Sequence, residues 1–151
     1  KREERTTEGG LDVARDENRL AHYIAPLIEA GSRVSIFIGA EEHQLKSAHR
    51  IGAQVVELHS GAYCDAYHEG DFDTAEAELT KLREMTTFGH SLGLEMHVGH
   101  GLTYDTVGPV AALPEVMALN IGHFLIGESI FRGLAPAMAE MRRLMDDARG
   151  V

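Results

Sequence analysis

Two histidines stand three positions apart among glycines in the stretch HVGHGL, residues 97–102. Such a pair is typical of half a metal site, a phosphate-binding loop, an acid–base group or a tight turn. His100 is flanked by Gly99 and Gly101, which let the backbone turn sharply and a ligand approach closely. Because an imidazole titrates near neutral pH, this setting favours an acid–base role for His100. A turn histidine that only caps a neighbouring carbonyl is the alternative.

A metal site built on this pair is disfavoured. On a strand the two rings point to opposite faces, and zinc needs further convergent ligands. We expect His97 to pack or hydrogen-bond at the wall of a strand, and we expect no metal site. Five other histidines, on helices or in loops, are predicted to lie on the surface: His22, His43, His49, His68 and His90.

A carboxylate stands near the end of the apolar run at residues 54–58. Strand alternation places Glu57 on the same face as Val55 and His59. If that face is enclosed, Glu57 lies in low-dielectric surroundings, suited to acid–base work or to holding a cationic intermediate. A structural ion pair or a solvated strand end is the alternative.

The stretch NIGHFLIGES, residues 120–129, is the most suggestive of phosphate binding. Gly122 and His123 stand where a strand turns into a short helix, so backbone N–H groups and the helix dipole face the strand end. His123 can add a charge-assisted hydrogen bond, while an ordinary strand-to-helix turn is the alternative. Near the start, Thr6 in TTEGG offers a hydroxyl to a substrate or caps a helix that starts near Asp12, and capping is the commoner role.

Alternating strands and helices must position these residues. Runs rich in β-branched residues predict four strands, at 34–38, 54–58, 94–98 and 116–121. Helical spacing predicts a helix up to Gly31 with a kink or break at Pro26, and a long helix over about 73–92. Residues 61–74 read as a polar connection, and two helices, the first of them short, follow the last strand.

This alternation predicts an α/β fold with parallel strands joined by right-handed crossovers. A doubly wound sheet and a (β/α)₈ TIM barrel are the two common outcomes. No glycine-rich dinucleotide fingerprint follows the first strand, and an extra short helix after the last strand is a recurrent barrel device, so the barrel is favoured. The four units would then be strands five to eight, with residues 1–151 forming the C-terminal part of a single domain. The opening KREERTTEGG reads as a loop that continues from an earlier half.

The amino-acid composition excludes some classes of partner and of cellular location. The formal net charge is -10, from 24 acidic and 14 basic residues, which argues against nucleic acid and anionic membranes. The single cysteine, Cys64, excludes an internal disulfide framework and fits a reducing cytoplasm. No apolar run approaches the roughly 20 residues that span a bilayer. We therefore expect a cytoplasmic protein.

The assembled motifs resemble those of the pyridoxine 5′-phosphate synthase family of vitamin B6 biosynthesis. The matching stretches run in family order across essentially the whole chain: TTEGGLDV, VSIFI, VVELHSGAY, GLEMHVGHGLTYDTV, ALNIGHFLIGESIFRGL and MRRLMDDAR. The combination of GHGLTY with LNIGH is highly specific to this family. The resemblance implies a (β/α)₈ barrel with extra helices, assembled as a homo-octamer, of which this sequence covers the C-terminal three-fifths.

The same resemblance implies an activity without a metal or an organic cofactor. The family condenses 3-amino-2-oxopropyl phosphate with 1-deoxy-D-xylulose 5-phosphate to pyridoxine 5′-phosphate, inorganic phosphate and water. His100 resembles the family's proton donor, and Glu57 resembles the carboxylate that stabilises the transition state. Thr6 matches a contact to the deoxyxylulose phosphate. Contacts to the aminooxopropyl phosphate match three residues: Gly101, Gly122 and His123.

The chain lacks several residues that the family uses. The family's further acid–base residues and its Asn-x-Asp-His motif have no counterpart here, so we expect these 151 residues alone to be inactive.

Two other classes of function are alternatives to this one. A different phosphate-binding barrel enzyme, of the sugar-phosphate isomerase or aldolase type, is one alternative. A Schiff-base aldolase needs a lysine at a strand end, whereas Lys46 and Lys81 fall on predicted helices. A phosphate-ligand sensor, or a decayed half-barrel that serves as an interaction module, is the non-enzymatic alternative.

Overall fold

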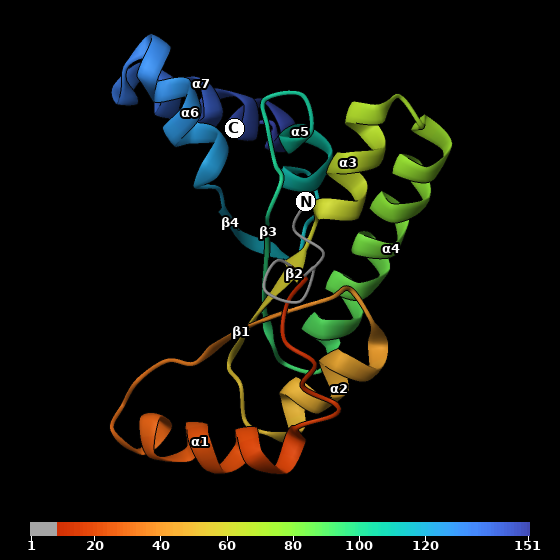
Figure 1. Ribbon diagram of the computed structural model, residues 1–151, viewed down its shortest axis with the longest axis vertical. Helices are drawn as coiled ribbons and strands as arrows, with labels where there is room; N and C mark the ends of the chain where they lie inside the picture. The colour runs from red at the N-terminus through yellow and green to blue at the C-terminus, as the bar shows by residue number, and fades with distance from the viewer. Residues whose placement is uncertain (1–8) are drawn as a thin grey trace, which may run out of the picture.

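The structure is a computed structural model that describes residues 9–151, and four strands alternate with helices along it (Figure 1). The elements, in chain order, are α1 (Glu17–Glu29), β1 (Ser35–Ile38), α2 (Glu42–Arg50), β2 (Val55–His59), α3 (Gly61–Glu69), α4 (Phe72–Ser91), β3 (Glu95–Gly99), α5 (Val107–Ala111), β4 (Val116–Asn120), α6 (His123–Arg132) and α7 (Leu134–Arg149). The predicted strands are confirmed, with ends that differ by one residue.

The four strands form one parallel sheet in the order β1-β2-β3-β4. The register sets Phe37 beside Glu57, Glu57 beside His97, and His97 beside Ala118. Because the strands are parallel, their carboxyl ends meet at one edge of the sheet. The predicted α/β fold with parallel strands is therefore confirmed.

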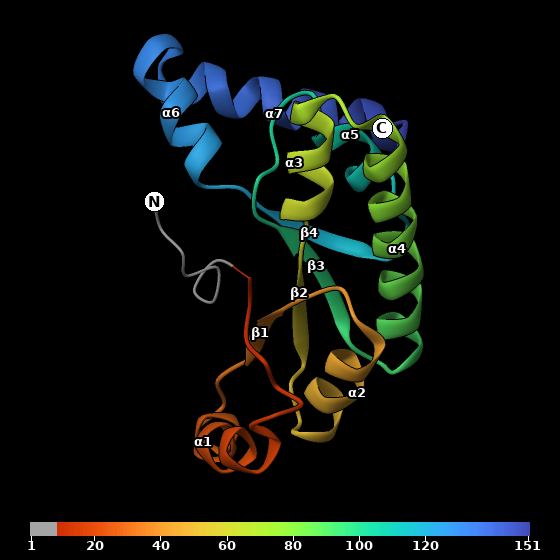
Figure 2. The ribbon, with the colours of Figure 1, turned by 45° about the vertical axis from the view of Figure 1, so that its right-hand side comes forward.

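The two faces of the sheet differ. On one face the side chains are buried, and Figure 2 shows α2 and α4 on this side: Ile36, Ile38, Val56, Leu58, Met96 and Val98. On the opposite face Phe37, Glu57 and His97 are half-buried. Beyond β4, helices α5, α6 and α7 share a smaller apolar cluster that includes Val107 and Met141. Hence only one face of the sheet is packed by helices in the described part of the chain.

A loop before α1 lies along the outer edge of β1. The N–H of Leu11 donates to the carbonyl of Phe37 at 2.8 Å. The buried amide of Gln44, on α2, accepts from the N–H of Val13 at 2.8 Å and of Ala14 at 3.1 Å. Its amide nitrogen donates to a carboxylate oxygen of Asp12, and this bond lowers the pKa of Asp12. One side chain thus ties the loop to α2.

Three expectations about the helices were wrong. The first helix starts at Glu17, within one residue of the stretch 16–31 that has helical spacing, and not near Asp12, where a cap by Thr6 would need it to start. Of the kink or break expected at Pro26, the break is wrong: the helix continues through this residue, because the carbonyl of His22 that the proline leaves without a donor lies on an exposed turn. The predicted polar connection over 61–74 contains α3 and the start of α4. Tyr63, Cys64 and Ala66 bury one side of α3, although charged residues interrupt their spacing.

Two further expectations are confirmed. Lys46 and Lys81 lie on helices, α2 and α4. The five histidines expected on the surface are all exposed. Within residues 9–151, no helix is both long and apolar enough to span a membrane.

Substituting Gln44 tests the anchor of the loop. We expect Gln44→Met to lower the free energy of unfolding by about 1–3 kcal/mol, because the buried N–H of Val13 and that of Ala14 lose their acceptor. Urea denaturation of the protein measures the change. Lys46→Met, on the exposed side of the same helix, is the control and is expected to stay within about 0.5 kcal/mol of the parent. Equal losses in the two variants would show that the amide bonds are unimportant.

Candidate active site

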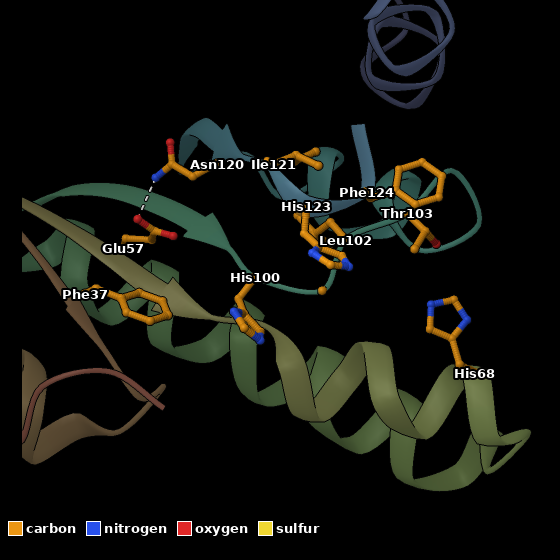
Figure 3. Close-up of a pocket in the computed structure, with 12 residues that line it drawn as sticks. Phe37, Glu57, His68, His100, Leu102, Thr103, Asn120, Ile121, His123 and Phe124 are labelled. Atoms are coloured by element: carbon orange, nitrogen blue, oxygen red, sulfur yellow. Dashed lines mark hydrogen bonds between the residues drawn. The ribbon is translucent and has the colours of Figure 1, made fainter. Parts of the chain in front are cut away.

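A cavity of about 710 Å³ lies at the carboxyl ends of the strands (Figure 3). Its volume falls in the range of roughly 300–1,000 Å³ that small-molecule sites occupy. The lining residues are Phe37, Glu57, His68, His100, Gly101, Leu102, Thr103, Asn120, Ile121, Gly122, His123 and Phe124. Every predicted site residue except Thr6 is among them, and Thr6 lies outside the described residues. The structure thus brings together groups that the sequence places on three different strand ends.

Glu57 reaches across the end of β3 toward β4. Its carboxylate accepts a hydrogen bond from the side-chain amide of Asn120 at 2.7 Å, as Figure 3 shows. This path crosses Gly99, where a Cβ would lie 2.2 Å from a carboxylate oxygen of Glu57 and 2.8 Å from the carbonyl oxygen of Asn120. A glycine is therefore required at this strand end. Because the partner is a neutral amide, the contacts within residues 9–151 do not support the alternative that Glu57 forms a structural ion pair.

His100 lies just beyond β3, which ends at Gly99. Its φ is 75°, and no other non-glycine residue in the described part of the chain has a positive φ. This left-handed conformation is uncommon for a side chain other than Asn, Asp or His, and such strain clusters at functional sites. Strand alternation, our argument for separating the rings of His97 and His100, does not govern a residue past the strand. The turn after β3 sets the direction of the His100 ring instead.

The end of β2 holds this turn in place. The Ser60 hydroxyl lies 2.7 Å from the carbonyl oxygen of Gly99 and 2.7 Å from that of His100, while the Ser60 N–H donates to Gly99 at 2.8 Å. The Cys64 thiol donates to the His100 carbonyl at 3.9 Å. Burial raises the pKa of Cys64 to about 11, so the group remains a protonated donor rather than a nucleophilic thiolate.

The loop after β4 supplies the opposite wall. Gly122 precedes α6 and His123 is its first residue, so N–H groups of the first helical turn face the cavity without intrahelical acceptors. The ring of Phe124 packs edge-on against Tyr104 with centroids 4.7 Å apart, which joins the loops after β3 and β4. The geometry suits an anion at this wall, as the sequence predicts.

His97 lies away from the cavity on the half-buried face of the sheet. Its Nε2 is 2.8 Å from a carboxylate oxygen of Glu95, and Glu95 also pairs with Arg33. These two partners lower the pKa of Glu95. The expected hydrogen-bonding role of His97 is confirmed. Among residues 9–151, no three or more His, Cys, Asp or Glu side chains converge as they would around a metal ion.

Seven lining residues were not among the predicted site residues: Phe37, His68, Leu102, Thr103, Asn120, Ile121 and Phe124. His68 is exposed, as expected, yet it lies at the mouth of the cavity because α3 returns over the strand ends (Figure 3). The apolar spacing of α3 was the available signal. Asn120, Ile121 and Phe124 belong to the predicted phosphate-binding stretch NIGHFLIGES, so they could have been found. Leu102 and Thr103 lie in the family motif GHGLTY and Phe37 lies in VSIFI, but the motifs alone do not specify which of their residues line a cavity.

Comparison with known proteins matches nearly the whole chain to one protein family. A sequence profile described as "Pyridoxal phosphate biosynthesis protein PdxJ" matches residues 1–147. Proteins named "Pyridoxine 5'-phosphate synthase" are similar: 76% identical over 149 residues in Ruegeria pomeroyi, 75% in Roseobacter denitrificans and 66% in a Jannaschia species. Each match covers 99% of this chain and 60% of the relative. The chain therefore spans about three-fifths of the length of these relatives.

Gly99→Ala tests the close approach at the end of β3. The added Cβ would collide with the Asn120 backbone, which cannot rotate away, and would displace the Glu57 carboxylate. In a chain of the relatives' length we expect a loss of about 1–3 kcal/mol in the free energy of unfolding. Gly108→Ala is the matched control, since nothing lies within 4 Å of its Cβ position. If both alanine variants unfold at the same denaturant concentration, the steric argument fails.

Two substitutions of His100 test its backbone strain. Glycine adopts a positive φ without a Cβ penalty, whereas alanine keeps that penalty. In the same chain, we expect the free energy of unfolding of His100→Gly to be about 1–2 kcal/mol higher than that of His100→Ala. Thermal and urea denaturation of the two variants measure the difference. An alanine variant as stable as the glycine variant would mean that the turn relaxes its φ at no cost.

Proposed function

The chain belongs to the PdxJ family of pyridoxal phosphate biosynthesis proteins, and from this we propose that the full-length enzyme, a chain of the relatives' length that contains these residues, is a pyridoxine 5′-phosphate synthase. It condenses 3-amino-2-oxopropyl phosphate with 1-deoxy-D-xylulose 5-phosphate and releases inorganic phosphate and water. The observation that carries this proposal is the single cavity shared by Glu57, His100 and the strand-end loops.

The reaction needs several proton transfers. An amine joins a ketone, water and phosphate leave, and an aromatic ring closes. His100 is the proton donor: it stands on the cavity wall, and a histidine side chain can both donate and accept a proton. Glu57, held by Asn120, stabilises the cationic character that develops when the ketone carbon becomes an imine. No metal or organic cofactor takes part in these steps.

The phosphate of the amino substrate binds at the wall made by the loops after β3 and β4. Gly101 presents its amide there, Gly122 leads into the first turn of α6, and His123 adds an imidazole. Local N–H donors suffice for an anion even in a chain of net charge -10. Thr6 remains a predicted contact to the deoxyxylulose phosphate.

The sheet is one half of a closed (β/α)₈ barrel, to which residues 1–151 contribute strands five to eight of a single domain. Parallel sheets in doubly wound folds are apolar on both faces because helices cover both. Here the face without helices carries the polar side chains of Glu57, Glu95 and His97, and Glu57, toward the carboxyl ends of the strands, lines the cavity, where a barrel has its active site. The relatives' additional length supplies the chain that closes it. From the family resemblance we infer that the assembled enzyme is a homo-octamer.

A different phosphate-binding barrel enzyme is the second candidate. A Schiff-base aldolase gains no support, because Lys46 and Lys81 lie on helices and neither lines the cavity. A phosphate-ligand sensor would bind both substrates without turning them over. Substrate titration beside turnover in the full-length enzyme separates these candidates.

Substitutions in the cavity test the assigned roles. We expect His100→Asn and Glu57→Gln to lower kcat of the full-length enzyme by roughly 10²–10⁴-fold, because each removes a group that acts in the transition state. Binding of the aminooxopropyl phosphate, followed by calorimetry, should persist. His90→Asn, exposed on α4 away from the cavity, is the matched control and should keep full activity. Unchanged kcat in His100→Asn would exclude it as the proton donor, and binding without turnover in the parent enzyme would favour the sensor.

A further inference from the structure

A row of aromatic rings crosses the ends of the first three strands. The ring of His59 lies 5.4 Å from that of Phe37 and 4.4 Å from that of His100, measured between centroids. The two imidazoles are stacked, with 24° between their planes. We propose that His59 is a positioning residue that sets the orientation of the His100 ring. The effect on catalysis rests on the proposed function, whereas the effect on the ring does not.

The His59 ring is itself held by the start of α3. The N–H of Gly61, the first residue of that helix, donates to Nδ1 of His59 at 3.1 Å. A helix of this kind usually takes its cap from the preceding serine, but the Ser60 hydroxyl points to the turn after β3 and makes no cap bond. His59 thus satisfies a helix N–H that would otherwise lack an acceptor, and this bond orients its ring.

This bond also selects one form of the His59 side chain. A ring nitrogen that accepts an N–H carries no proton, so the bound form is the neutral imidazole with its proton on Nε2. A neutral ring can stack on His100 whether His100 is protonated or not, since no like charges face each other. Protonation of Nδ1 would set two N–H groups against each other and break the bond to Gly61. His59 therefore supports the proton donor rather than sharing its role.

The absence of a side chain at residue 61 makes room for the stack. A Cβ on Gly61 would lie 2.3 Å from Cε1 of His59 and 3.2 Å from Cδ2 of His100. Any larger residue would push the two rings apart. The sequence His-x-Gly at the end of β2 is therefore the local pattern that allows the stack.

The stack acts on a part of His100 that the hydrogen bonds leave free to rotate. The bonds from Ser60 and Cys64 end on the His100 carbonyl, so they hold its backbone. The ring is held through its face by His59. A proton donor displaced by about 1 Å loses up to roughly 10²-fold in rate, so the orientation of this ring matters for turnover.

The test uses two substitutions of His59 in the full-length enzyme. His59→Asn keeps an acceptor near the Nδ1 position for Gly61 but has no aromatic face. We expect crystals of this variant to show the His100 ring turned from its present orientation, with the backbone of residues 99–101 unchanged. We expect His59→Phe, which keeps an aromatic face, to leave the His100 ring stacked. An unmoved His100 ring in the asparagine variant, or a turned ring in the phenylalanine variant, would overturn the proposal even if the enzyme had another activity.

Kinetics supply the second readout. We expect His59→Asn to lower kcat about tenfold, with KM changed by less than about threefold, because binding does not depend on the His100 ring. In a His100→Asn background the same substitution should produce no further fall in kcat, since the group it positions is gone. A merely structural His59 would lower kcat equally in both backgrounds, and that result would contradict the proposal. His90→Asn again serves as the control.

Discussion

The in-register parallel pairing of the strands sets the distances within the candidate site. Glu57 and His97 are partners in the ladder, and His59 is level with Gly99, which is level with Asn120. A slip of one residue would turn Glu57 toward the helices and bring an apolar side chain to the cavity. The buried face prevents such a slip, because the side chains on that face are almost fully removed from water. The hydrophobic core thereby fixes the position of the polar site, which it reaches through Leu102, a buried residue that also lines the cavity.

The turn after β3 shows how local strain is maintained by neighbours. His100 adopts a left-handed conformation that costs about 1–2 kcal/mol, and the hydrogen bonds from the Ser60 hydroxyl and the Cys64 thiol to its carbonyl offset part of that cost. Ser60 lies in the connection between β2 and α3, and Cys64 lies on α3 itself. The strand that carries Glu57 thus also supports the histidine of the next strand. Coupling of this kind explains why the ELHSG and HVGHG stretches act as one structural unit although 35 residues separate them.

Much of this arrangement was accessible from the sequence. Runs of β-branched residues located the ends of every strand to within one residue, because buried parallel strands are nearly continuous apolar runs in a sequence. The glycines around His100 marked the turn, and the family motifs indicated the residues that line the cavity. Helix α3 was missed because charged residues interrupt its apolar face, and the place of His68 was missed with it. The stack of His59 on His100 depends on side-chain torsions and on a positive φ, neither of which a residue pattern specifies.

On the face of the sheet without helices, the surroundings of the carboxylates change along the strands. At the amino ends of the strands, the Glu95 carboxylate bonds to Arg33 and to His97, so each of its two oxygens already has a partner. Toward the carboxyl ends, Glu57 bonds to a single neutral amide and lies on the cavity. Two carboxylates on one face of adjacent strands therefore have different surroundings, one paired with a cation and one open to a ligand. Because the cation holds the pKa of Glu95 below its usual range, that carboxylate stays charged and structural, and the chemistry is left to the groups at the strand ends.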